Sequence, residues 1–419
     1  MRWPANSFHG AERPTAADTR TLLALLRPSV EPSAITESIN LPASRWNNLT
    51  DQATRHGVAP LLHRALLLGG RLPQIPSAAV TKLAAERQIT ALDNLRNFSE
   101  FGRVARALQA HSIPMIALKG MHLADLVYRD ISLRPMSDID ILVPFVQVDA
   151  AVEVLVSLGY LQNSKLASGY DIGLTAPRLE ILLELHWNLA APSEPCTPPI
   201  DEIWRTAVQA RIADADVLVM TPEFLLLHVC AHLAYHHLFA LDFRALCDID
   251  EIVHSTPQFD WEFLIDRAQH GNMARGVAAA LRMAREQLGT AVPEDVLSRL
   301  GGNALDQRFL EDALEQMSAH PDLPQALQFA PNLLRLAAAA SPLSRLAMLL
   351  RRIFIPRAEL AALYGIPDQR ARILPFYAIR LLDLLRNYGG SAWALVTDRS
   401  RLAGTSARNE RLAIWLSNS

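Results

Sequence analysis

The hydrophobic pattern of this 419-residue chain changes its period between residues 111 and 190, and this change restricts the possible folds most. From about residue 17 to residue 110, apolar residues recur every three or four positions, which is typical of amphipathic helices. Between residues 111 and 190, short apolar runs bounded by glycine or proline, such as IPMIALKG and DIDILVP, indicate strands. After a proline-rich segment the pattern is helical again. The sequence therefore predicts an α+β, mostly helical fold with a small mixed sheet.

The same pattern divides the chain into five expected parts. They are an N-terminal helical region (1–110), an α/β core (111–190), a proline-rich linker (191–200), a helical domain that contributes to a substrate cleft (201–300) and a C-terminal helical region (301–419). Within the core, the runs GYDIGLTA and RLEILLELHWNL are expected to form a hairpin that turns at Ala176-Pro177-Arg178.

Composition narrows the class of protein. Half of the residues are hydrophobic and the formal net charge is −3, so no nucleic acid or anionic membrane is indicated as the main partner. The three cysteines are too few and too scattered for a disulfide framework, which favours a reducing, cytoplasmic setting. The N-terminus lacks the apolar core of a signal peptide, and no window of about 18 uninterrupted apolar residues predicts a membrane span.

Two carboxylates mark the start of the strand DIDILVP. Because side chains alternate along a strand, Asp138 and Asp140 are expected on one face, with Ile139, Ile141 and Val143 on the other. At roughly 5 to 7 Å and an effective dielectric of about 20, two such charges repel by about 3 kcal/mol. A hard divalent cation such as Mg²⁺, which binds carboxylates together with substrate phosphates, would remove this repulsion. A solvated strand start is the alternative interpretation.

Basic and small residues near this strand indicate phosphate binding. Lys119 and Gly120 end a strand-like run just before a helix, where a glycine backbone, a helix dipole and an ammonium group can all contact a phosphate. Arg134 lies four residues before Asp138 and is expected to neutralise phosphate charge, with a surface residue or a structural clamp as the alternative interpretations. Ser137, directly before Asp138, completes the predicted nucleotide-binding set.

The run LEILLELHWNL has one strongly polar face. Glu180, Glu184, His186 and Asn188 alternate with apolar residues, so Glu184 and His186 are expected to face a site, unless this face of the sheet is simply exposed to solvent.

Histidines recur on a later helix, in LLLHVCAHLAYHH. His228, His232 and His236 have the i, i+4, i+8 spacing of one helix face, and an i, i+4 histidine pair can bind zinc. The HExxH motif is not present, because residue 229 is valine. We therefore favour a cleft role, in which His232 and His236 line the α/β core together with Arg244 and Asp248 of the following helix.

The order of these elements resembles the DNA polymerase β superfamily of nucleotidyltransferases. That superfamily has a glycine-containing turn, a strand with paired acids and a third acid on a later strand. The sequence is most similar to the branch of uncharacterised bacterial nucleotidyltransferase family proteins, through LKG, Tyr128, the arginine before DIDILV, and LELHW. It departs from the superfamily pattern at Met121, which follows Gly120 where serine is usual, and in a longer spacing from Gly120 to Asp138.

The resemblance implies a nucleotidyltransferase core and a reaction. Asp138 and Asp140 would hold one or two Mg²⁺ (or Mn²⁺) ions on the triphosphate, and Glu184 would share the second ion and help to activate the acceptor. The nucleoside triphosphate, with ATP as the expected nucleotide, would give its nucleotidyl group to a hydroxyl on a small molecule, a peptide or a protein, with release of pyrophosphate. The alternatives are a metal-dependent DxD glycosyltransferase and a non-catalytic or toxin–antitoxin-like interaction protein on the same fold.

Overall fold

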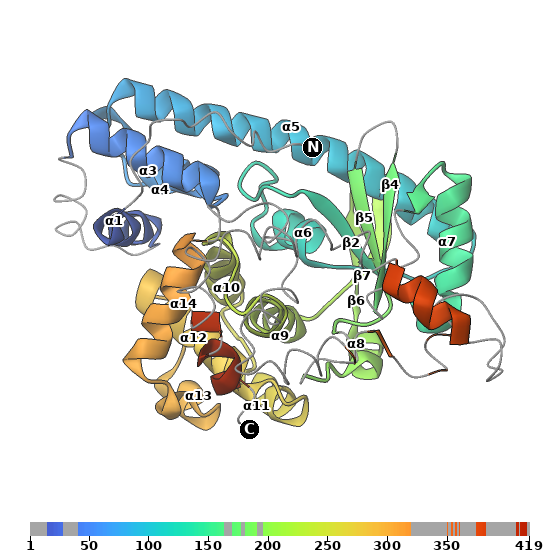
Figure 1. Ribbon diagram of the computed structural model, residues 1–419. Helices are drawn as coiled ribbons and strands as arrows, with labels where there is room; N and C mark the ends of the chain where they lie inside the picture. Colours follow the sequence, from blue (N-terminus) through green and yellow to red (C-terminus); the bar gives the residue numbers. More distant parts are fainter. Residues whose placement is uncertain are drawn as a thin grey trace.

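The computed structural model (Figure 1) describes residues 15–27, 41–162, 170–176, 181–190 and 196–319, and short pieces of the chain between 350 and 416. The expected turn at Pro177-Arg178, Glu180, residues 191–195 of the expected linker and most of the expected C-terminal region lie outside the described residues. No helix among the described residues is long and apolar enough to cross a membrane.

The first helices form one side of the molecule. They are α1 (Ala16–Leu26), α3 (Ala43–Arg55), α4 (Ala59–Leu68), the 3-10 turn η1 (Leu72–Gln74) and α5 (Ser77–Ala110). The 34-residue helix α5 extends from α3 and α4 to the sheet (Figure 1). Phe98, Phe101, Val104 and Leu108 of α5 are buried in the core that covers one face of this sheet. The last turns of α5 therefore belong to the core of the sheet as well as to the N-terminal helices.

The sheet is mixed, as the sequence predicted. Its seven strands have the order β3-β4-β5-β2-β1-β7-β6, with β2 parallel to β5 and β1 parallel to β7. The strands are β1 (Ile116–Ala117), β2 (Asp138–Leu142), β3 (Leu161–Gln162), β4 (Asp171–Ala176), β5 (Ile181–His186), β6 (Val208–Ile212) and β7 (Ala215–Val219).

Strands β6 and β7 correct one expectation. The sequence pattern predicted only helices after residue 200, and this prediction is wrong for residues 208–219, where a hairpin pairs with β1. Its two-residue turn, Ala213-Asp214, has φ of 51° and 57°, a conformation that usually requires Asn-Gly or Asp-Gly. Because the usual turn residues are missing, this hairpin has no clear sequence signature.

Helices surround the sheet on both faces. Helix α7 (Val148–Ser157), preceded by the 3-10 turn η3 (Phe145–Gln147), packs with α5 against the apolar face. The opposite face looks towards α6 (Lys119–His122), the π-helix η2 (Leu123–Val127) and the second helical half (Figure 1). That half contains α8 (Ile200–Thr206), α9 (Pro222–Ala231), the π-helix η4 (His232–His236), α10 (Arg244–Ser255), α11 (Trp261–His270), α12 (Ala274–Leu288), α13 (Glu294–Arg299), the 3-10 turn η5 (Gly302–Ala304) and α14 (Gln307–Ala319).

A buried ion pair joins the loop before β2 to the second helical half. Arg134 donates from Nε and Nη2 to the Asp248 carboxylate of α10, both at 2.9 Å, and the Tyr128 hydroxyl donates to the same carboxylate at 3.0 Å. The Arg134 and Asp248 side chains are only 9% and 5% exposed. This clamp holds α10 against the segment that leads into Asp138.

We expect Asp248→Asn to lower the free energy of unfolding by about 3–5 kcal/mol, because it leaves the Arg134 guanidinium buried without a counter-charge. Urea unfolding followed by circular dichroism would measure this loss. Glu262→Gln, which breaks the exposed pair between Glu262 and Arg299, is the matched control and should leave stability nearly unchanged. Equal effects of the two substitutions would contradict a special role for the clamp.

Candidate active site

The predicted separation of faces on β2 is confirmed. Ile139, Ile141 and Val143 are fully buried in the core under α5 and α7, and Asp138 and Asp140 point to the opposite face. In the parallel β2–β5 ladder, Asp140 is the register partner of Glu184. Leu142 in the same ladder is the register partner of His186. The parallel register thus puts both predicted acids of β2 and both predicted polar residues of β5 on one surface.

Three of these side chains converge. The His186 Nε2 lies 3.1 Å from the Asp140 Oδ1 and 3.5 Å from the Glu184 Oε2. Potential ligand atoms of Asp140, Glu184 and His186 all lie within 4.8 Å of one another. Asp138 occupies the next row of the ladder, opposite Leu182, and is not part of this converging group.

Lys119 brings a positive charge to the acids. Its Nζ lies 3.6 Å from the Asp140 Oδ1, and the side chain is 17% exposed. Burial alone would lower the pKa of the Lys119 ammonium, but Asp140, Glu184, Asp138 and Asp171 together raise it. Lys119 has φ of 29°, outside the usual range for a residue with a Cβ, and such a conformation costs of order 1–3 kcal/mol. The backbone is therefore strained at Lys119, the residue whose ammonium group lies beside Asp140.

The pKa values of the two aspartates of β2 shift in opposite directions. Burial, followed by Asp140 and Glu184, raises the pKa of Asp138 to about 7. Burial would also raise the pKa of Asp140, but Lys119 and His186 hold it well below its usual range. The repulsion that the sequence predicted therefore falls on Asp138, while Asp140 remains ionised.

His186 is held in the same network. Burial would lower the pKa of its imidazole, but hydrogen bonds to Asp140 and Glu184 raise it to about 9. Its other ring nitrogen, Nδ1, is buried and has no hydrogen-bond partner. The ring therefore makes its polar contacts through Nε2 alone.

Asp171 is a member of this surface that the sequence analysis missed. It lies on β4 as the register partner of His186, and Gly173 lies opposite Glu184. Burial raises the pKa of Asp171 to about 6, lowered in part by His186 and raised further by Glu184. Following the two-residue alternation of GYDIGLTA across the antiparallel pair would have placed it on the polar face.

Gly120 has a steric reason to be glycine. A Cβ at this position would lie 2.6 Å from the Met136 Sδ and 3.4 Å from the Arg134 Nη1. The start of α6 therefore packs directly against the loop that carries Arg134 to Asp138, which keeps Lys119 next to the acids.

The histidines of the second helical half form a chain of rings. Ring centroids lie 6.0 Å apart for His228 and His232, 5.2 Å for His232 and His236, and 4.5 Å for His232 and His237. Tyr170 connects this chain to the sheet, since its ring lies 5.7 Å from that of His236 and 5.8 Å from that of His186. The predicted histidine stripe therefore lies beside the acidic surface.

The histidine stripe is uncharged at its start and centre. Burial, assisted by the nearby Lys119 charge, lowers the pKa of both His228 and His232 well below the usual value. The buried Nε2 of His228 has no hydrogen-bond partner. Among the described residues, the converging group of possible metal ligands is the one on the sheet and not this stripe.

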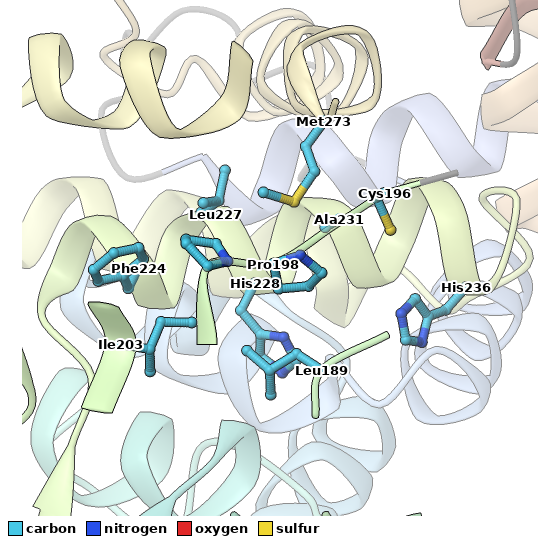
Figure 2. A pocket seen from close by; sticks show the side chains of 11 residues that line it. Leu189, Cys196, Pro198, Ile203, Phe224, Leu227, His228, Ala231, His236 and Met273 are labelled. Carbon is cyan, nitrogen blue, oxygen red and sulfur yellow. The ribbon is translucent and has the colours of Figure 1, made fainter. Parts of the chain in front are cut away.

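A small, mostly apolar cavity lies next to the stripe. His228 and His236 both line it, together with Leu189, Cys196, Phe224 and Met273 among others (Figure 2). The two imidazoles are thus the polar groups of an otherwise hydrophobic wall.

The sequence from residue 42 to residue 289 matches the family of uncharacterised nucleotidyltransferases. This match covers more than half of the chain. The chain belongs to this nucleotidyltransferase family. A crystal structure of an antigenic nucleotidyltransferase-like protein from Paracoccidioides brasiliensis is 15% identical and has a TM-score of 0.31, covering 52% of this chain and 92% of that one. No curated protein matches the chain.

In this nucleotidyltransferase family protein, the remaining predicted site residues lie near the acids of β2 and β5. The Arg134 guanidinium is bound to Asp248, and Ser137 is exposed immediately before β2. Arg244 donates from Nη1 to the Pro135 carbonyl, and its charge lowers the pKa of Asp138 in part. The phosphate contacts of Arg134 and Ser137 stay predictions, as do the substrate contacts of Arg244 and Asp248.

The raised pKa of Asp138 makes stability depend on pH. The folded protein favours the protonated carboxyl, so this contribution is full below the unfolded pKa of about 4 and is lost as pH rises through about 7. Without metal, the free energy of unfolding of Asp138→Asn should therefore rise relative to that of the wild type, by about 1–3 kcal/mol more at pH 8 than at pH 5. Urea unfolding with EDTA at both pH values measures it. Asp216→Asn, at an exposed position of β7, should show no such gain, and a pH-independent difference for Asp138→Asn would contradict the assignment.

Proposed function

We propose that this nucleotidyltransferase family protein transfers a nucleoside monophosphate from a nucleoside triphosphate, with ATP as the expected donor, to a hydroxyl-bearing acceptor, and that the transfer depends on a divalent cation. The observation that carries the proposal is the parallel pairing of Asp140 with Glu184, next to Asp138 and Lys119 on one buried surface. Three carboxylates on two adjacent strands can bind a cation, and the lysine beside them can neutralise phosphate oxygens. Both are needed when a phosphoryl group is transferred.

The residues of this surface fit a divalent cation. Four carboxylates, those of Asp138, Asp140, Asp171 and Glu184, act on Lys119, which is the lysine of this surface among the described residues. Burial raises the pKa of Asp138 most, and the negative charges of Asp140 and Glu184 raise it further, so a bound cation would relieve part of this shift. Carboxylate oxygens are the preferred ligands of Mg²⁺ and Mn²⁺. When bound, the cation would neutralise the triphosphate and stabilise the leaving pyrophosphate.

The side chains of the chain have separate roles in this proposal. Asp138 and Asp140 hold the cation, and Glu184, 31% exposed on the adjacent strand, shares it and accepts a hydrogen bond from the acceptor hydroxyl. Lys119 places its ammonium beside Asp140, where it neutralises phosphate oxygens. The acceptor oxygen attacks the α-phosphorus, the bond from this phosphorus to the β-phosphate oxygen breaks, pyrophosphate leaves, and the hydroxyl proton passes to a carboxylate or to solvent.

The helical wall, which consists of the histidine stripe His228, His232 and His236, is where we place the hydroxyl-bearing acceptor. His228 and His232 are neutral because burial lowers their pKa. The Tyr170 ring lies between His236 of this stripe and His186, which contacts the acids. Neutral imidazoles orient a hydroxyl by hydrogen bonding without competing for the triphosphate. Three buried, free cysteines agree with a reducing, cytoplasmic setting for this reaction.

The proposal predicts labelling by an α-³²P-labelled nucleoside triphosphate. With Mg²⁺ or Mn²⁺ and a cell extract as the source of acceptor, we expect the wild type to transfer label and release pyrophosphate. Asp140→Asn should lower the rate by at least ~100-fold, because it removes a charge that binds the cation.

Controls separate the alternatives. Asp216→Asn, the same change at an exposed position of β7, should keep the wild-type rate. Transfer of label by Asp140→Asn at the wild-type rate would contradict the proposal. Transfer from a labelled sugar nucleotide in place of the nucleoside triphosphate would favour the glycosyltransferase alternative.

A further inference from the structure

The group of ligand atoms that converges on this surface contains a nitrogen. It consists of Asp140, Glu184 and His186, and it does not include Asp138. The register explains this composition, since Asp140 and Glu184 are direct partners across the ladder and His186 follows Glu184 by two residues on the same face. Asp138 lies one row further along, opposite Leu182, at the start of β2.

The spacing within this group agrees with shared coordination. Two atoms bound to one ion at about 2.1 Å lie about 3.0 Å apart at a right angle and about 3.4 Å apart at a tetrahedral angle. The His186 Nε2 lies 3.1 Å from the Asp140 Oδ1 and 3.5 Å from the Glu184 Oε2. The oxygen atoms of Asp140 and Glu184 lie within 4.8 Å of each other, so one ion could bind all three groups once the two carboxylates close around it.

The position of the His186 ring also agrees with a ligand role. The residue is 3% exposed and directs Nε2 at both carboxylates, while Nδ1 is buried with no hydrogen-bond partner. A histidine that binds a metal through Nε2 carries its proton on Nδ1, and a carboxylate commonly orients such a ring. Nδ1 makes no such contact in this structure, and Asp171, the register partner of His186 on β4, acts on the ring only through its charge.

We propose that His186 supplies its Nε2 to the cation, so that the site selects a first-row divalent transition-metal ion such as Mn²⁺ over Mg²⁺. This inference rests on the proposed function only for the presence of a cation at Asp140 and Glu184. Mg²⁺ strongly prefers oxygen ligands, whereas an imidazole nitrogen strengthens the binding of transition-metal ions. The carboxylates thus provide the affinity for a divalent cation, and the imidazole nitrogen of His186 determines which divalent cation is preferred.

The test uses the full-length protein and the metal alone, with no nucleotide. Electron spin-echo spectroscopy of bound Mn²⁺ should show modulation by a directly coordinated imidazole nitrogen. Calorimetric titration should give a dissociation constant at least ~10-fold lower for Mn²⁺ than for Mg²⁺. The spectroscopic measurement needs no variant, so it stands even where a substitution disturbs folding.

Two variants test whether the coordinated nitrogen belongs to His186. His186→Gln should remove the modulation and weaken Mn²⁺ binding by about 10- to 100-fold, with Mg²⁺ binding changed by less than about threefold. His111→Gln, at an exposed helix end, should leave all three readouts unchanged.

Three outcomes overturn the inference. They are Mn²⁺ bound without nitrogen modulation, equal weakening of both ions by His186→Gln, and equal affinity of the wild type for both ions. If neither ion binds while nucleotidyl transfer also fails, the proposed function fails as well. If the enzyme is active with Mg²⁺ and shows no nitrogen modulation with Mn²⁺, the inference about His186 alone fails.

Discussion

The parallel ladder between β2 and β5 is the constraint on which the rest of the site depends. It pairs Asp140 with Glu184 and so turns two separate acidic motifs, more than 40 residues apart in the sequence, into one surface. A shift of one residue in this register would move Glu184 and His186 to the apolar face under α5 and α7. The buried apolar side of the sheet prevents that shift, because Ile139, Ile141, Leu183 and Leu185 are all fully buried there.

The second constraint is the position of β2 relative to the helices. Arg134 and Tyr128 bind Asp248 of α10, and Gly120 allows Met136 to pack against the start of α6. These contacts connect the loop before Asp138 to the helical half, which carries the histidine stripe. The clamp therefore connects the sheet to the helical half, and the ring of Tyr170 lies between His186 of the sheet and His236 of the histidine stripe. An arginine that sequence position alone would assign to phosphate binding has here a structural partner.

The sequence predicted those features of the site that depend on strand alternation. Asp138, Asp140, Glu184 and His186 share a face as predicted, because the period of two leaves no other arrangement for strands with one apolar side. Two features depended on long-range pairing and were not predicted. Asp171 joins the surface only through the register of β4 with β5, and the β6–β7 hairpin joins the sheet only by pairing with β1.

The histidines show the same limit from the helical side. The i, i+4 spacing correctly put His228, His232 and His236 on one stripe, but it did not indicate that the helix changes to a π-helix from His232 to His236. The wider turn brings His237 to the stripe as well, with its Nε2 3.3 Å from that of His232. Such single π-turns are frequent at functional sites and have no clear sequence signature.

The two walls of the site differ in what they can recognise. The sheet carries the ionisable groups of opposite sign, Lys119 and the carboxylates near it, and their interactions shift the pKa values of Lys119, Asp138 and Asp171. The helical wall carries imidazoles that Lys119 and burial keep neutral at His228 and His232. A triphosphate and its cation gain most from the charged wall, because Coulomb energy grows as water is excluded. A hydroxyl-bearing acceptor gains most from the neutral wall, where hydrogen bonds and apolar contacts do not oppose the charge of the donor. Under the proposed function, this division of charge would place the nucleotide donor at the sheet and the hydroxyl-bearing acceptor at the helices.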